Sequence, residues 1–320
     1  MKLVVLFPGQ GAQYSGMGQS LYKEFPEARA VFDAADAALG FSLSNLMFHG
    51  SAEELQLTEH TQPAVLTHSI AAWQVLRTHF PLWGAEVAAG LSLGEYSALV
   101  AADVIDFPDA LHIVKERGIA MQTAVPVGVG SMAAVLGLDT DKLEEIVQQV
   151  NGTCGVLAVA NYNTPGQIVI SGHNEAVEAA SELLKSAGAS RIIPLPVSAP
   201  FHCSLLHPAA DRLRDVLADI KVSDFKLKVI ANVTADYYPS TADVKDLLVR
   251  QVTNAVRWEQ GVRKLLADGY DTFVELGPGS TLGQFVRRTS REMVIKVNLA
   301  NFDKAEDLDL VKAVVGSTMG

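Results

Sequence analysis

Cysteine is scarce in this 320-residue chain, which contains only Cys154 and Cys203. The two cysteines do not form a C-x-x-C pair, so their spacing argues against a disulfide framework and against a cysteine-rich zinc site. The histidines between residues 49 and 79 are likewise scattered without the spacing of metal ligands. We therefore expect no metal site, and the cysteine usage fits a reducing compartment.

Long apolar runs and excess positive charge are also missing. No stretch approaches the roughly 20 apolar residues that span a bilayer, and the apolar run at residues 3–7 is too short for a signal peptide. The chain carries 25 Lys and Arg against 36 Asp and Glu, a formal net charge of −11. Such a balance argues against nucleic acid or an anionic membrane as the main partner. We expect a cytoplasmic protein that binds neither.

Aromatic residues are few, at 7%, whereas hydrophobic residues make up 49% of the chain, enough for a large core. Short apolar segments alternate with helical patterns, and glycine is frequent where the apolar segments end. Examples are a helix expected over residues 63–79 and a last strand expected over residues 294–299. This alternation predicts an α/β protein built on a mostly parallel sheet.

The pattern changes after a turn-rich segment at residues 126–130. From there the chain reads strand, helix, strand, strand, helix, strand, with a clear turn at residues 163–166 between the two middle strands. That order is the ferredoxin-like unit. We predict a discontinuous large α/β catalytic domain, residues 1–126 and 199–320, into which a ferredoxin-like subdomain of residues 127–198 is inserted.

The most informative motif is Gly90-Leu91-Ser92-Leu93-Gly94, which follows a short apolar segment and precedes a helical one. Gly-x-Ser-x-Gly between a strand and a helix is the nucleophile-elbow pattern. The tight turn exposes the serine hydroxyl, and glycines lack the Cβ atoms that would collide where strand and helix backbones pass closely. The helix also directs its N-terminal N–H groups toward an oxyanion. Five such residues also occur by chance, but their place between a strand and a helix favours Ser92 as a nucleophile.

Two further residues are candidates for the same site. Arg117 falls on the apolar face of a helix expected over residues 107–124. A buried arginine needs an anion, which could be a carboxylate of the protein or a carboxylate of a substrate, and the pattern leaves both open. His202 follows Pro200 outside any apolar periodicity, where a loop could present the imidazole, although a single loop histidine is more often structural.

Several motifs occur in order along about residues 1–300: FPGQGAQ, TQPA, GLSLGEYSALVAA, ERG, ANYNTPGQIVISG, SAPFH, RQVTNAVRW and ELGPGSTL. On these motifs the chain resembles the malonyl-CoA:acyl-carrier-protein transacylases. The resemblance implies a hydrolase-like α/β fold with a ferredoxin-like insert, which agrees with the organisation predicted above. It also implies an acyltransferase without a cofactor.

The implied reaction moves a malonyl group from malonyl-CoA to the phosphopantetheine thiol of acyl carrier protein, for fatty-acid chain elongation. The resemblance implies that Ser92 is the acylated nucleophile of a ping-pong mechanism and that His202 is its base. Arg117 would hold the malonyl carboxylate, which a guanidinium can grip with two parallel hydrogen bonds. The resemblance thus favours a substrate anion for Arg117.

Other roles also come only from the resemblance. Backbone N–H groups of Gln10 and Leu93 would form the oxyanion hole. Gln251 would help to orient His202, and Gln62 and Asn161 match positions near the pocket.

One departure and three alternatives qualify this interpretation. Leu91 stands where the family usually has histidine; its side chain cannot hydrogen-bond, but His202 is untouched and we expect activity to survive. No acidic residue between Ser92 and His202 stands out as the third member of a triad. The close alternative is a free-standing malonyl acyltransferase of a polyketide pathway. A serine thioesterase or esterase is disfavoured by Arg117, and a non-enzymatic binding module is the least favoured.

Overall fold

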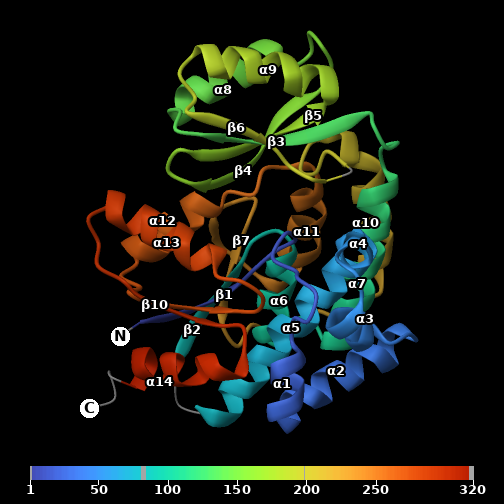
Figure 1. Cartoon of the computed structure of the whole chain (residues 1–320), viewed down its shortest axis with the longest axis vertical. Coiled ribbons are helices and arrows are strands. Elements are labelled where there is room, and N and C mark those ends of the chain that lie inside the picture. The colour runs from blue at the N-terminus through green and yellow to red at the C-terminus, as the bar shows by residue number, and fades with distance from the viewer. Residues whose placement is uncertain (1, 81–83, 198, 317–320) are drawn as a thin grey trace.

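Two β-sheets organise the computed structural model, which describes residues 2–80, 84–197 and 199–316 (Figure 1). The large sheet has the strand order β10-β9-β1-β2-β7-β8, and the small sheet has the order β4-β5-β3-β6. In Figure 1 the small sheet lies above the large one, with helices α8 and α9 on its far side. The mixed α/β class with a mostly parallel sheet is therefore confirmed.

The large sheet is parallel except at one edge, where β8 pairs antiparallel with β7. Its central strand, β1, is fully buried along its length, as expected for a strand covered on both faces. The strands are β1 (Leu3–Phe7), β2 (Ala85–Gly90), β7 (Lys228–Ala231), β8 (Asp236–Tyr237), β9 (Thr272–Leu276) and β10 (Asn298–Phe302).

Alternate side chains of β1 enter two separate cores. Leu3, Val5 and Phe7 pack in the larger core, whereas Val4 and Leu6 pack on the other face. Helices that contribute to the larger core are α1 (Gln19–Glu24), α2 (Pro26–Leu39), α3 (Leu43–His49), α4 (Ala52–Gln56), α5 (Thr58–His79), α6 (Leu93–Ala101), α7 (Phe107–Thr123), α10 (His207–Ala218), α11 (Val244–Thr253) and α14 (Leu308–Gly316). The other face is covered by α12 (Trp258–Ala267) and α13 (Thr281–Glu292). Within the described residues, no helix has the length and apolar character needed to cross a membrane.

The small sheet is antiparallel throughout, and its strand order is that of a ferredoxin-like unit. Its strands are β3 (Gly130–Leu136), β4 (Leu157–Thr164), β5 (Gln167–His173) and β6 (Arg191–Pro194), and its helices are α8 (Thr140–Val150) and α9 (Asn174–Ser186). One sheet face forms a core with the two helices. The subdomain limits of 127 and 198 remain a prediction, and residue 198 lies outside the described residues.

The last strand of the large sheet begins later than the sequence predicts. Strand β10 covers Asn298–Phe302, whereas the expected strand covered residues 294–299. Val294 has a positive φ of 57° and is 91% exposed, and the Ile295 N–H donates to the Ser290 carbonyl to close the end of α13. The apolar residues at 294 and 295 thus terminate a helix instead of starting a strand.

The turn between β2 and α6 is packed as closely as the motif predicts. A Cβ on Gly94 would lie 2.0 Å from the Phe7 carbonyl oxygen, and a Cβ on Gly90 would lie 2.0 Å from the Gly94 carbonyl group. No side chain fits at these distances, so both positions require glycine because neighbouring backbone atoms occupy the space of a Cβ atom. The serine between them is held at the carboxyl ends of two central strands.

Gly94→Ala should destabilise the fold by about 3 kcal/mol or more, because the new methyl group must displace backbone of β1. The measurement is the midpoint of urea unfolding. Gly283→Ala in α13 is the matched control, since the nearest atom to its Cβ is 3.5 Å away, and we expect a change within about 1 kcal/mol. Equal midpoints for Gly94→Ala and the unaltered chain would contradict this account of the turn.

Candidate active site

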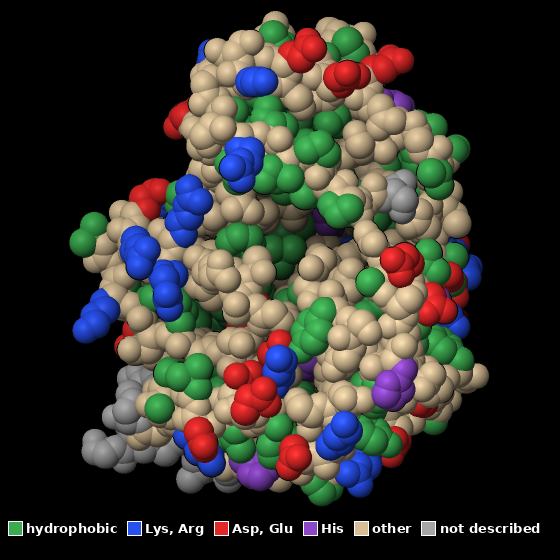
Figure 2. All heavy atoms as spheres, viewed as in Figure 1, with side chains coloured by type: hydrophobic (Ala, Val, Ile, Leu, Met, Phe, Trp, Pro, Cys, Tyr) green, Lys and Arg blue, Asp and Glu red, His purple; other side chains and the backbone are tan. Residues whose placement is uncertain are grey.

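A pocket of about 260 Å³ lies between the two sheets. The space-filling view shows the surface hollowed in this region (Figure 2). The pocket walls come from the loops after β1 and β2, from α7 and α13, from the loop that carries His202, and from strands β3, β4 and β5. The site therefore combines segments that are far apart in the sequence.

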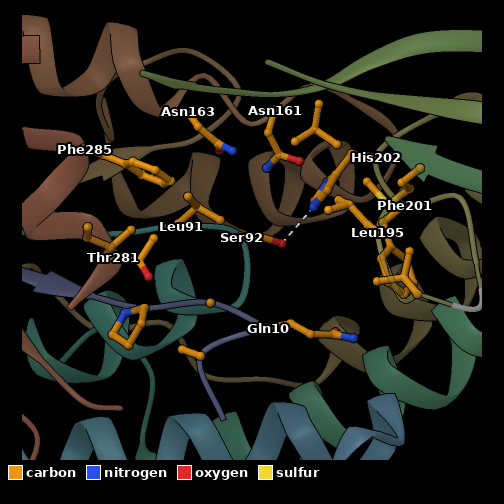
Figure 3. Close-up of a pocket in the computed structure, with 18 of the residues that line it drawn as sticks. Gln10, Leu91, Ser92, Asn161, Asn163, Leu195, Phe201, His202, Thr281 and Phe285 are labelled. Carbon is orange, nitrogen blue, oxygen red and sulfur yellow. Dashed lines mark hydrogen bonds between the residues drawn. The ribbon is translucent and has the colours of Figure 1, made fainter. Parts of the chain in front are cut away.

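Ser92 occupies the turn between β2 and α6 and lines this pocket. Its φ of 52° places a non-glycine residue in the left-handed region, a conformation that the surrounding packing must maintain. Ser92 Oγ lies 2.8 Å from His202 Nε2, the contact drawn as a dashed line in Figure 3. The structure thus joins the predicted nucleophile and the predicted base.

His202 is buried, with 5% of its surface exposed, and also has a positive φ, 61°. Its Nδ1 lies 2.8 Å from the backbone carbonyl of Gln251. Because a carbonyl only accepts, Nδ1 carries the proton and Nε2 is left to accept from the Ser92 hydroxyl. Burial, reinforced by the positive charge of Arg117, lowers the pKa of His202 to about 4. The imidazole is therefore neutral at physiological pH, as a base must be.

Arg117 is buried, as its place on the apolar face of α7 predicts, with 2% of its surface exposed. One terminal nitrogen donates to Gln62 Oε1 at 2.9 Å. The other donates to Ser92 Oγ at 3.0 Å and to Gln251 Oε1 at 2.9 Å. Among the described residues no carboxylate forms an ion pair with Arg117 within 4.0 Å, and its planar group lies over the Tyr96 ring, 5.3 Å from the centroid. This disfavours a protein carboxylate as its anion and leaves the guanidinium at the pocket for a ligand.

The remaining predicted residues lie in or directly behind the pocket. Gln10 and Asn161 line it, and Gln62 is buried behind it, where it holds Arg117 (Figure 3 labels Gln10 and Asn161). Leu93 is the first residue of α6, so its N–H is one of those without a partner inside the helix. A hydrogen bond of 3.2 Å from the Leu91 N–H to the Phe7 carbonyl joins the loops that carry Gln10 and Leu93. Their role as an oxyanion hole stays a prediction.

Gln251 contacts His202 through its backbone carbonyl, whereas its side chain contacts other residues of the site. The Nε2 group donates to the Ser92 carbonyl at 2.9 Å and to Glu95 Oε2 at 2.6 Å. The Oε1 atom accepts from Arg117. One residue thus contacts the segments of the nucleophile, the base and the cation.

Sequence reasoning missed two polar residues behind the nucleophile. Asn232, directly after β7, accepts from the Ser92 N–H at 2.7 Å and donates to the Gly90 carbonyl at 2.7 Å. Glu95 is 1% exposed and is the only charged residue of α6, a signal that could have identified it. Burial raises the pKa of Glu95 to about 7, against hydrogen bonds from Tyr238, Gln251 and Asn232 that lower it.

Leu91, in the place of the usual histidine, lines the pocket with its apolar side chain. In Figure 3 it lies on the same side as Phe285, Thr281 and Asn163. It is partly buried and packs against the core on the α12 and α13 face of the large sheet. Over the described ranges, no group of three or more His, Cys, Asp and Glu side chains is arranged to hold a metal ion.

The acyl transferase domain family matches this chain over residues 4–316. The malonyl CoA-acyl carrier protein transacylase of Bacillus subtilis (strain 168) is 47% identical over 292 residues, which cover 91% of this chain and 92% of the relative. The enzyme of the same name from Haemophilus influenzae is 42% identical, covering 96% of this chain and 98% of the relative.

Solved structures agree with these sequence relatives. The malonyl CoA-acyl carrier protein transacylase of Clostridium perfringens superposes with a TM-score of 0.94 at 39% identity, covering 100% of this chain and 98% of that one. PlMCAT, a malonyl transacylase solved with AntF, a type II polyketide acyl-carrier protein, superposes with a TM-score of 0.93 at 38% identity, covering 99% and 100%.

The His202 imidazole should stay neutral until the pH falls to about 4, well below its usual range. A lowered pKa means that the unfolded chain binds this proton more tightly, so stability from neutral His202 is present above about pH 6.5 and is lost progressively toward pH 4. NMR titration of the ring Cε1–H measures it, with His202→Gln to assign the resonance. A midpoint near 6.5 in the folded protein would show that burial and Arg117 do not act as described.

Proposed function

Since this chain belongs to the malonyl CoA-acyl carrier protein transacylase family of acyl transferases, we propose that it moves a malonyl group from malonyl-CoA to acyl carrier protein through an acyl-serine at Ser92. One observation carries the mechanism: His202 Nε2 and an Arg117 terminal nitrogen both lie within 3.0 Å of Ser92 Oγ. A base and a carboxylate-binding cation thus converge on one nucleophilic oxygen.

In the first half-reaction, Ser92 Oγ attacks the thioester carbonyl while His202 Nε2 takes the hydroxyl proton. The resulting oxyanion accepts hydrogen bonds from the backbone N–H groups of Gln10 and Leu93. The carbon–sulfur bond then breaks, and His202 returns the proton to the departing CoA sulfur. The products are malonyl-Ser92 and free CoA.

The second half-reaction reverses these roles. The carrier's phosphopantetheine thiol gives its proton to His202 and attacks malonyl-Ser92, and the proton then returns to Ser92 Oγ as the ester bond breaks. Both half-reactions need only the two substrates and groups of the protein itself, namely Ser92, His202 and the backbone N–H groups of Gln10 and Leu93, so the proposal includes no cofactor. It also places the reaction in the cytoplasm.

Arg117 supplies selectivity for malonyl. The malonyl carboxylate is separated from the acyl carbon by one methylene group, and Arg117 lies beside the oxygen that carries the acyl group. A guanidinium matches a carboxylate with two parallel hydrogen bonds, which a neutral acyl group cannot accept. Because Arg117 has no ion-pair partner among the described residues, its positive charge is available to bind the malonyl carboxylate.

The carrier is assigned to fatty-acid synthesis on the resemblance of the sequence motifs, and the names of the sequence relatives give an acyl carrier protein as the acceptor. The similarity to PlMCAT, whose structure holds a type II polyketide carrier, supports a polyketide carrier as the second candidate. Transfer rates from malonyl-Ser92 to a fatty-acid carrier and to a type II polyketide carrier distinguish the two. A higher kcat/KM for the polyketide carrier would favour the second.

Ser92→Ala should abolish covalent labelling by malonyl-CoA, because the attacking oxygen is removed. Intact mass spectrometry after brief incubation measures the malonyl adduct. Ser97→Ala, at a buried serine of the following helix α6, is the control that should keep the adduct. A persistent adduct on Ser92→Ala would place the nucleophile elsewhere.

Arg117→Ala should reverse acyl selectivity. In the unaltered protein an acetyl group leaves a buried cation unpaired, and sites of this kind discriminate by factors of about 10⁴. In the variant the malonyl carboxylate becomes the unpaired charge, so malonyl transfer collapses while acetyl transfer holds steady or rises. The measurement is kcat/KM for malonyl-CoA and acetyl-CoA. Equal losses for both substrates in a folded variant would make Arg117 a structural residue.

A further inference from the structure

A buried carboxylate lies directly behind the candidate active site. Glu95 Oε2 accepts from the Asn232 N–H at 3.2 Å and from Gln251 Nε2 at 2.6 Å, and Oε1 contacts the Tyr238 hydroxyl. Glu95 does not line the pocket, and the two half-reactions described above do not use it. Burying a carboxyl group costs free energy of folding, so we expect Glu95 to have a function that offsets this cost.

Within the described part of the chain, neither Glu95 nor Arg117 has an ion-pair partner within 4.0 Å. The two opposite charges are instead joined by one side-chain amide. Arg117 donates to Gln251 Oε1 at 2.9 Å, and Gln251 Nε2 donates to Glu95 Oε2 at 2.6 Å. The amide therefore presents its carbonyl end to the cation and its N–H end to the anion, which is the favourable orientation toward both.

This separation has a physical consequence. A carboxylate in direct contact with the guanidinium would occupy the donors that a substrate carboxylate needs. A carboxylate one amide away leaves those donors free, yet still interacts strongly with the cation, because charges interact over longer distances in a buried, weakly screened site. At this distance the Glu95 carboxylate can stabilise the buried Arg117 guanidinium and still leave its donors free to bind a ligand.

We propose that Glu95 is a positioning residue that acts through Arg117: it is the counter-charge of the guanidinium, held one amide away so that the cation can be buried and still bind the substrate carboxylate. The inference rests on the proposed function, since it takes malonyl as the ligand of Arg117. It predicts opposite effects for removing the counter-charge and for placing a carboxylate in direct contact with Arg117.

Binding is measured in the Ser92→Ala background, where no acyl transfer competes. Calorimetry at pH 8, above the pKa of Glu95 of about 7, gives dissociation constants for malonyl-CoA and for acetyl-CoA. Glu95→Gln keeps the shape but removes the charge, so the uncompensated Arg117 should bind malonyl-CoA about tenfold more tightly, with acetyl-CoA unchanged. A defect that is merely structural would weaken binding instead.

Gln62→Glu places a carboxylate in direct contact with Arg117, where Oε1 already accepts a hydrogen bond at 2.9 Å, and the lost Nε2 group contacts only the Met121 sulfur at 3.9 Å. This variant should bind malonyl-CoA at least about tenfold more weakly, with acetyl-CoA changed much less. Glu275→Gln is the matched control: Glu275 is also 1% exposed, but its carboxylate accepts from the backbone N–H groups of Leu282 and Gly283 at the start of α13. It should leave the malonyl-to-acetyl ratio of dissociation constants unchanged.

The outcomes separate two kinds of failure. If Ser92→Ala alone shows no preference for malonyl-CoA over acetyl-CoA, the role of Arg117 in the proposed function is wrong. If that preference is present but Glu95→Gln leaves it unchanged or weakens it, only the role of Glu95 is wrong. If Glu95→Gln does not fold, Gln62→Glu alone tests the inference, and unchanged malonyl-CoA binding in that variant would overturn it.

Discussion

The Arg117 guanidinium is a full positive charge in the interior with no carboxylate in contact among the described residues, and much of the site depends on it. Its hydrogen bonds to Gln62 and Gln251 fix its position through neutral oxygens. Burial is the larger cause of the lowered pKa of His202, and the charge of Arg117 adds to it, so the cation that is available to an anion also helps to keep the neighbouring imidazole unprotonated. In the proposed mechanism, the selectivity for the acyl group and the basicity of His202 are therefore linked through a single buried charge.

Sheet topology brings these groups together. The carboxyl ends of β1, β2 and β7 lie side by side, and the loops after them supply Gln10, Ser92 and Asn232. Arg117, on α7, and His202 with Gln251 then reach the same point from later parts of the chain. Ligand sites at the carboxyl edge of a parallel sheet are a general outcome of such connections.

Local patterns were enough to predict the groups whose signal lies in their own neighbourhood. The elbow around Ser92 depends on spacing within a few residues, and the burial of Arg117 follows from helical periodicity. Asn232 was missed because its contact with Ser92 depends on β7 lying next to β2, a pairing that no local pattern encodes. The start of the predicted last strand was wrong for a related reason. Apolar residues at 294 and 295 suit a strand, but they form the closing turn of α13, and the strand begins at Asn298.

The pocket is assembled from two sheets. One face of the small sheet packs with α8 and α9, whereas Met132 and Val169 on its other face belong to the larger core of the large sheet. Ser92, His202, Arg117 and Gln251 all belong to segments packed around the large sheet, whereas Met132, Asn161 and Val169 reach the pocket from the small sheet. Substitutions in the second group can reshape the cavity without disturbing the hydrogen bonds among the first. The architecture is thus suited to divergence, in which new acyl groups or carriers are accommodated on one wall while the reacting groups on the other are inherited unchanged.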